Sequence, residues 1–165
     1  MLEPAIWHKE ELEELFKKEI YTDDFFFYAG YGGCHELPVI QLADHQRQYA
    51  ICDIDENNNK KVIGYVAYRV NPTTRDCYNF GLYSFDKKNI VIGIDIKNLM
   101  TELIQKHHRI EWRCISGNPV QKYYDIFCDR IGGRRVCLHD VTKDEKGQYH
   151  NEYIYEVINE KEVTI

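Results

Sequence analysis

The most constraining feature of the sequence is a helical pattern between two stretches of strand character. From Ile92 to Gln105, apolar residues recur at the i, i+4, i+7 and i+8 positions of a helix that buries one face. Segment 77–85 is rich in aromatic residues, and in segment 110–114 apolar residues alternate with Glu111 and Arg113, so both are predicted strands. A strand, a helix and a strand in this order form a crossover whose strands lie parallel in one sheet. The sequence therefore predicts a mixed α/β sheet.

The other elements are expected on both sides of this crossover. They are a helix at 9–20, a short helix after Tyr21, strands at 48–54 and 61–70, a helix at 118–131, and a final hairpin of 134–141 and 148–158. Polar turns separate the strands before the crossover, so these strands should pair antiparallel. Gly81, in the middle of strand 77–85, marks a bulge or a close backbone approach. The predicted fold class is α/β (α+β), a mixed, mostly antiparallel central sheet with one parallel, splayed strand pair, flanked by helices.

Composition limits the classes of function. At 165 residues the chain predicts a single domain, 1–165. The net charge of −6 predicts no nucleic-acid partner, because phosphate neutralisation requires a basic surface. No apolar run is long enough to span a membrane and no signal peptide is apparent, so no membrane partner is expected. Six cysteines form neither a CxxC pair nor a cluster with zinc spacing. We therefore expect a cytoplasmic protein with reduced thiols and no metal.

The segment from Phe80 to Gly133 carries the most specific pattern. Gly93 lies where a strand leads into a helix, and amides at a helix start can hold a pyrophosphate when glycine allows close approach. Asn118 precedes the later helix, and Tyr124 follows six residues on. The element order and these three residues resemble the GNAT superfamily of acyl-CoA-dependent N-acyltransferases.

The resemblance implies acetyl-CoA as co-substrate and assigns its contacts. These contacts are Tyr83, Phe85, Lys88, Ile92, Gly93, Ile94, Asp95, Asn118 and Tyr124. Two positions depart from the pyrophosphate motif of the family, because Ile90 replaces its Gln or Arg and Asp95 replaces its second Gly or Ala. Lys87 or Lys88 would then supply the missing positive charge near the phosphates.

The resemblance also implies that Tyr124 is the general acid that protonates the departing thiolate, with Tyr123 as a rival because the family's spacing is more often seven. Glu111, on the strand beside the expected cleft, is a candidate general base; a solvent-facing charge and a water chain are the alternatives. The predicted function is N-acetyl transfer to a primary amine of a small molecule or protein. The alternative is a catalytically degenerate module that binds acyl-CoA or a protein partner.

The acceptor site is expected in the aromatic segment that follows the first helix. The candidate residues are Asp23, Asp24, Tyr28 and Tyr31, with the final hairpin on the other side of the cleft. Carboxylates beside aromatic rings suit a cationic amine. In the alternative interpretation, the acids cap a helix and the rings fill the core. The sequence leaves the chain open as a monomer or a homodimer.

Overall fold

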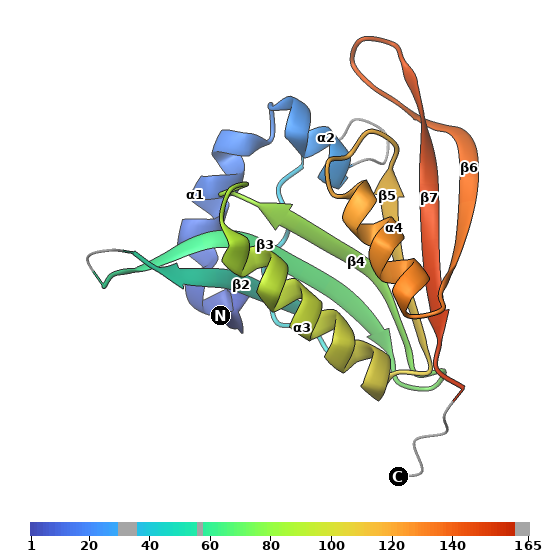
Figure 1. Ribbon diagram of the computed structural model, residues 1–165. Coiled ribbons are helices and arrows are strands. Elements are labelled where there is room, and N and C mark those ends of the chain that lie inside the picture. The colour runs from blue at the N-terminus through green and yellow to red at the C-terminus, as the bar shows by residue number, and fades with distance from the viewer. Residues whose placement is uncertain (30–35, 56–57, 161–165) are drawn as a thin grey trace.

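A computed structural model describes residues 1–29, 36–55 and 58–160 (Figure 1). The strands are β1 (Leu2–Pro4), β2 (Gln46–Ile54), β3 (Lys60–Asn71), β4 (Asp76–Ser84), β5 (Arg109–Ile115), β6 (Arg134–Lys143) and β7 (Tyr149–Ile158). The helices are η1 (Ala5–His8, a 3-10 helix), α1 (Lys9–Glu19), α2 (Asp23–Ala29), α3 (Ile90–Lys106) and α4 (Gln121–Arg130). Most of these bounds lie within a few residues of the prediction.

All seven strands belong to one sheet, in the order β1-β2-β3-β4-β5-β7-β6. Strands β4 and β5 are parallel and α3 joins them, while the other neighbouring strands pair antiparallel. The predicted mixed sheet with one parallel pair is therefore confirmed. Strand β1 was not predicted, because three residues are too few to display a strand period.

Helices cover the two faces of the sheet, with α3 and α4 on one face and α1 and α2 on the other (Figure 1). The alternation of side chains along each strand supplies both cores. On β4, for example, Phe80 belongs to the core under α3 and α4, and Tyr83 belongs to the core under α1 and α2. The sheet is thus buried on both faces around the crossover.

A side-chain cap fixes the start of α3. The Asn89 side chain accepts a hydrogen bond from the Val91 amide at 3.0 Å, which satisfies one of the unpaired amides of the first turn. The helix therefore begins at Ile90, two residues before the predicted start. Residues 90–95, predicted as a phosphate loop, are the first turns of the helix itself.

Five cysteines lie in the described part of the chain, and all five are free thiols: Cys52, Cys77, Cys114, Cys128 and Cys137. Within the same residues, every helix is too short or too polar to cross a lipid bilayer.

Candidate functional site

The parallel strands β4 and β5 diverge towards their C-terminal ends (Figure 1). Their paired residues are Asp76 with Arg109, Cys77 with Ile110, and Phe80 with Trp112. Beyond that last pair both strands continue, β4 to Ser84 and β5 to Ile115, without pairing to each other. We call the region between residues 81–84 and 113–115 the splay.

A β-bulge in β4 lies at the beginning of the splay. Ala67 on β3 pairs with Gly81 and Arg69 pairs with Tyr78, so two β4 residues stand opposite one β3 residue. Asn79, in the bulge, has a positive φ of 52°, a conformation that asparagine adopts more readily than most residues. The bulge predicted near Gly81 thus lies immediately before it.

Strand alternation determines which backbone groups face the splay. The Phe85 amide donates to the Ile63 carbonyl on β3 at 2.9 Å, so Tyr83 and Gly81, two and four residues earlier, also direct their backbone groups to β3. The groups of the intervening residues, Leu82 and Ser84, point towards β5. They can pair with an extended ligand lying in the splay.

This geometry differs from the prediction for Tyr83 and Phe85. Their backbones are used by β3 and their rings pack in the core under α1 and α2, each within 5.5 Å of the Phe16 ring centroid. The Tyr83 hydroxyl donates to Glu19 at 2.7 Å. Both side chains therefore lie on the face of the sheet covered by α1 and α2, not on the face covered by α3 and α4.

Two buried polar atoms, one on each splayed strand, have no hydrogen-bond partner among the described residues. They are Ser84 Oγ and Trp112 Nε1. Both side chains point to the face covered by α3 and α4. Trp112 belongs to that core, as does Phe80, and Ser84 lies four residues after Phe80 and therefore on the same face of β4. Buried polar groups normally have partners, so these two atoms favour a polar ligand in the splay.

The start of α3 lies directly after β4 and its loop. Gly93 is exposed, and a Cβ built on it meets no atom within 4 Å, so the helix surface there is open. Ile92 is buried in the core, whereas Ile90 and Ile94 are 77% and 53% exposed. Lys88 is exposed, and its ammonium group makes no ion pair with the described residues. The open surface at Gly93 and this lysine suit an anion; the two isoleucines do not.

Asp95 forms an ion pair with the Met1 amino group, and its side chain is 18% exposed. Lys87 pairs with Asp24. Lys87 and Lys88 were the two lysines predicted to supply positive charge near the phosphates. Of these, Lys88 is the one without an acidic partner among the described residues.

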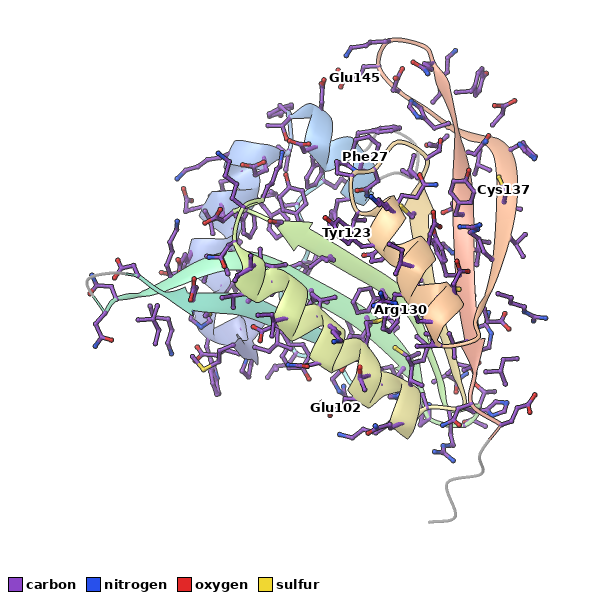
Figure 2. All side chains as sticks on the ribbon, in the orientation of Figure 1. Phe27, Glu102, Tyr123, Arg130, Cys137 and Glu145 are labelled. Carbon is purple, nitrogen blue, oxygen red and sulfur yellow. The ribbon has the colours of Figure 1, made fainter. Side chains whose placement is uncertain are left out.

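The two candidate acids on α4 have opposite environments. Tyr124 packs against Trp112 and Tyr155, with ring centroids 6.3 and 6.0 Å away. Burial, and then the nearby Cys114 thiol, raise the pKa of Tyr124 above its ordinary value. Tyr123 is 70% exposed on the same helix (Figure 2). Tyr124 therefore contacts the residue at which β4–β5 pairing ends, and its hydroxyl stays protonated.

Asn118 was predicted as the N-cap of α4, which in the structure begins at Gln121. The Asn118 side chain accepts from the Val120 amide at 3.0 Å and so orders the turn that leads into the helix.

Glu111 lies on the face of β5 opposite Trp112, in a ladder of ion pairs. Arg109 and Arg113 donate to its carboxylate at 2.5 and 3.0 Å. Burial alone would raise the pKa of Glu111, but the hydrogen bonds from both arginines outweigh burial and lower it. A carboxylate held in this way is a poor proton acceptor near neutral pH, so we do not assign it as the general base.

Helix α2 crosses the opposite face of the splay. Tyr28 lies over Gly81, where an added Cβ would be 3.2 Å from the tyrosine ring. Phe27 (Figure 2) reaches Gly117 in the loop after β5, at 3.8 Å by the same measure. One helix thus contacts both sides of the splay. Burial raises the pKa of Tyr28, so its hydroxyl is protonated.

The two acids at the start of α2 already have cationic partners. Asp23, whose side chain is 91% exposed, is 3.4 Å from Lys146 in the β6–β7 turn. Asp24 pairs with Lys87 in the β4–α3 loop. Tyr31 lies outside the described residues.

His150 also lies at this end of the splay and was not a sequence candidate. Its Nε2 is 3.1 Å from Asp144 Oδ2, its Nδ1 is 3.3 Å from the Ser116 carbonyl, and its ring centroid is 5.1 Å from that of Phe26. A lone histidine in a predicted hairpin gives no sequence signal, because only the fold brings it to α2 and β5.

A surface hollow of about 460 Å³ lies between η1 and the beginning of β2. Strands β3 and β4 separate it from the splay in the sheet order, so it is not part of the candidate site.

Comparisons with known proteins agree on the fold. An N-acetyltransferase from Staphylococcus aureus aligns over 96% of this chain and 97% of its own, with 13% identity and a TM-score of 0.64. A probable GNAT-family acetyltransferase from Chromobacterium violaceum aligns over 96% and 85%, with 15% identity and a TM-score of 0.61. A GCN5-related N-acetyltransferase from Brucella melitensis aligns over 95% and 74%, with 18% identity and a TM-score of 0.59.

Other matches cover less of their chains. This protein spans 63% of a probable acetyltransferase and 62% of a ribosomal alpha-N-protein acetyltransferase in complex with coenzyme A, each with a TM-score of 0.50. No protein-family profile and no curated protein matches the sequence.

The matched structures are acetyltransferases, and their similarity to this chain extends over the whole fold. The protein has the fold of the GNAT superfamily, and the predicted resemblance is confirmed for the fold.

Proposed function

We propose that the protein is an N-acyltransferase that moves an acetyl group from acetyl-CoA to a primary amine of a small molecule or a protein. The observation that carries this proposal is the splay, into which β4 directs the backbone groups of Leu82 and Ser84. The unpartnered Ser84 Oγ and Trp112 Nε1 on its two strands add polar atoms for a ligand.

The residues around the splay fit an extended CoA. The carbonyl of Leu82 and the backbone groups of Ser84 would pair with the amides of pantetheine, as a neighbouring strand does. The first turn of α3, open at Gly93, would face the pyrophosphate, and Lys88 would supply a positive charge. A neighbour with the same fold was solved with coenzyme A bound, which supports this ligand class.

The chemistry requires three contributions from the chain. The thioester supplies an activated acyl group, and the protein must orient it towards the amine. The Leu82 amide can donate to the carbonyl oxygen as negative charge develops on it. Tyr124, protonated and in contact with Trp112, would give its proton to the departing thiolate.

The amine would enter from the side of α2. That side is lined by Tyr28, which lies over Gly81, and by the His150–Asp144 pair. Asp23 and Asp24 supply negative charge near its rim. A cationic amine would compete there with Lys146 and Lys87 for the two carboxylates. Water is the proton acceptor we favour, because both nitrogens of His150 already have partners.

Thermal denaturation with cofactor tests the proposal. A ligand that binds only the native state stabilises it by about 2.7 kcal/mol at a hundredfold excess over its dissociation constant. Acetyl-CoA and CoA should raise the melting temperature clearly, and adenosine, as the control, should not. An unchanged melting temperature at millimolar acetyl-CoA would contradict the proposal.

A second candidate is a non-catalytic module that binds acyl-CoA or a protein partner. Ile90 and Ile94, exposed where a phosphate would lie, favour it. If acetyl-CoA binds, an activity assay with a panel of primary amines distinguishes the two candidate functions. Release of CoA thiol supports the enzyme, and binding without any turnover supports the module.

The remaining expectations form part of the proposal. The acidic net charge of −6 favours an acceptor other than nucleic acid. The free thiols at Cys52, Cys77 and Cys114 suit a reducing compartment such as the cytoplasm.

A further inference from the structure

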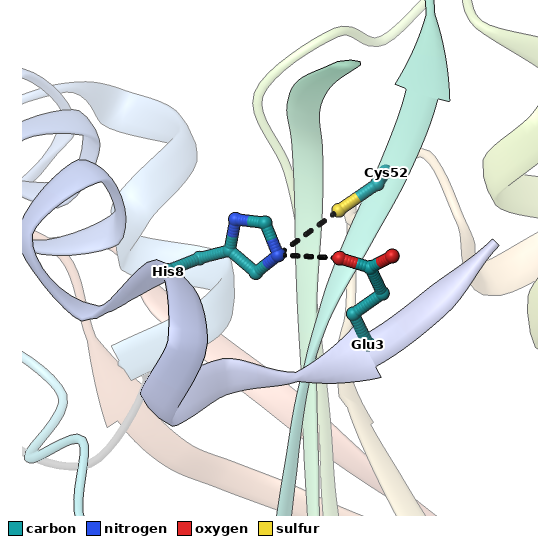
Figure 3. A group of neighbouring side chains, drawn as sticks. All are labelled: Glu3, His8 and Cys52. Atoms are coloured by element: carbon teal, nitrogen blue, oxygen red, sulfur yellow. Dashed lines mark hydrogen bonds and ion pairs between the residues drawn. The ribbon is translucent and has the colours of Figure 1, made fainter.

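Three side chains with metal-binding chemistry converge at the edge of the sheet far from the splay (Figure 3). They are Glu3 on β1, His8 on η1 and Cys52 on β2, and their ligand atoms all lie within 4.8 Å of one another. His8 Nε2 is 2.7 Å from Glu3 Oε2 and 3.7 Å from Cys52 Sγ. The Glu3 and His8 side chains are each 14% exposed, and Cys52 is 1% exposed.

We propose that Glu3, His8 and Cys52 bind a divalent transition-metal ion of the zinc class. Carboxylate oxygen, imidazole nitrogen and thiolate sulfur are the three ligand types that zinc uses in proteins. Zinc bonds of about 2.0–2.3 Å imply roughly 3.5 Å between neighbouring ligand atoms of a tetrahedron. The 3.7 Å between the sulfur and Nε2 is close to that value. The 2.7 Å contact between Nε2 and Glu3 is a hydrogen bond, which the metal would replace.

The residues that surround Glu3 and His8 leave one metal-binding atom of each side chain available. Lys60 occupies Glu3 Oε1 at 2.6 Å, which leaves Oε2 for the metal. Glu11 Oε2 lies 3.7 Å from His8 Nδ1, and Glu11 Oε1 is fixed by the Val62 amide at 3.3 Å. A carboxylate behind a metal-bound histidine is a common arrangement that orients the ring.

Metal binding requires a new position for two protons, one on Cys52 and one on His8. The metal displaces the thiol proton of Cys52 to solvent. The imidazole proton of His8, which Nε2 donates to Glu3 in the absence of metal, moves to Nδ1 and faces Glu11. Water would complete the coordination sphere.

Such a site would stabilise the fold rather than take part in acyl transfer. Strand β1 has three residues and η1 has four, and the metal would join both to the longer β2. Strands β3 and β4 separate the site from the splay, and its test measures metal binding rather than acyl transfer, so failure of this proposal is distinguishable from failure of the proposed function. His8 and Cys52 are 44 positions apart in the sequence, so no motif of short spacing contains both.

Cobalt titration of the metal-free chain, prepared without a polyhistidine tag, tests the proposal. We expect one Co²⁺ per chain, a thiolate-to-cobalt charge-transfer band, loss of that band when Zn²⁺ is added, and a higher melting temperature with Zn²⁺. Cys52→Ser should abolish the band. Cys77→Ser is the matched control, because Cys77 is an equally buried free thiol on β4. Glu11→Gln, which keeps the bond to Val62, should weaken binding about 10- to 100-fold.

A chain that shows no charge-transfer band, or a band that persists in Cys52→Ser, would overturn the proposal. If Cys52→Ser does not fold, as judged by circular dichroism, His8→Gln provides the second test. Persistence of stoichiometric binding in a folded His8→Gln variant would overturn the proposal equally.

Discussion

Phe80 on β4 and Trp112 on β5 form the last pair of the parallel ladder, and the two strands separate beyond them. Phe80 is itself one of the two bulge residues, together with Asn79. Since a bulge increases the local twist and bends its strand, it turns the end of β4 away from β5. The position of the proposed ligand-binding region therefore depends on one residue of unusual backbone conformation.

Asn79→Val should destabilise the protein by about 1–2 kcal/mol, because a β-branched residue is strained at a positive φ. The Asn79 side chain is exposed, so lost packing contributes little to the change. Urea denaturation measures the free energy of unfolding. Asn79→Gly is the control and should match the parent, since glycine adopts this φ freely. Equal stability of the valine variant would show that the bulge is not strained.

Gly93→Ala should raise the stability of the ligand-free protein and lower its affinity for acetyl-CoA. An exposed helical glycine costs about 0.5–1 kcal/mol relative to alanine, and the new Cβ meets no atom within 4 Å. The same Cβ would obstruct phosphates that approach the first turn of α3. Calorimetric titration and thermal denaturation measure the two effects.

Lys97→Ala, an exposed change one turn further along α3, is the matched control and should leave the affinity unchanged. If Gly93→Ala binds acetyl-CoA as tightly as the parent, the phosphates do not approach this turn.

The fold was predictable because its signals are local and redundant. The apolar period of α3 is long, and strands on both sides of it have clear bounds, so the crossover followed directly. The final hairpin is marked by its polar turn between β6 and β7. Strand β1 has no such signal, because its three residues are specified by pairing with β2.

The candidate site was predictable only in part. The side of β4 that faces the splay depends on the register with β3, which directs Leu82 and Ser84, rather than Tyr83 and Phe85, towards β5. Register is a tertiary property that the alternation of residue types within β4 does not encode. By contrast, the partners of Glu111 were accessible from sequence, because Arg109 and Arg113 lie two residues before and after it on β5 and therefore share its face of the sheet.

Glu111→Gln should lower the free energy of unfolding at pH 7 by about 1 kcal/mol, as expected for a partly buried ion pair. The pKa of Glu111 is lowered in the folded state, so the unfolded state binds more protons in acid. The stabilisation is therefore fully present well above pH 4.5, the ordinary value, and is lost as the pH falls through the lowered pKa.

Chemical denaturation of parent and variant from pH 7 to pH 3 measures this loss, and the difference between them should shrink towards zero in acid. Glu10→Gln, on the exposed side of α1, is the control and should differ little from the parent at any pH. A difference that is constant with pH would mean that Glu111 acts through packing and not through its charge.

Tyr124→Phe should slow acetyl transfer at least tenfold and leave the fold intact, because general acid catalysis contributes about a hundred- to ten-thousandfold. The ring contacts with Trp112 and Tyr155 remain in the variant. Among the described residues the Tyr124 hydroxyl has no hydrogen bond to lose, so the melting temperature should equal or slightly exceed that of the parent. Initial rates with saturating acetyl-CoA and a responsive amine give the measurement.

Tyr123→Phe is the matched control, one residue away on α4 and 70% exposed. Adjacent residues on a helix differ by about 100° in direction, so only one of the two hydroxyls can point at the thiolate. If Tyr123→Phe loses activity and Tyr124→Phe does not, the acid is the exposed tyrosine, and the ligand lies over the outer side of α4. If both variants keep full activity, the proton comes from another group or from water, and the contact between Tyr124 and Trp112 serves packing alone.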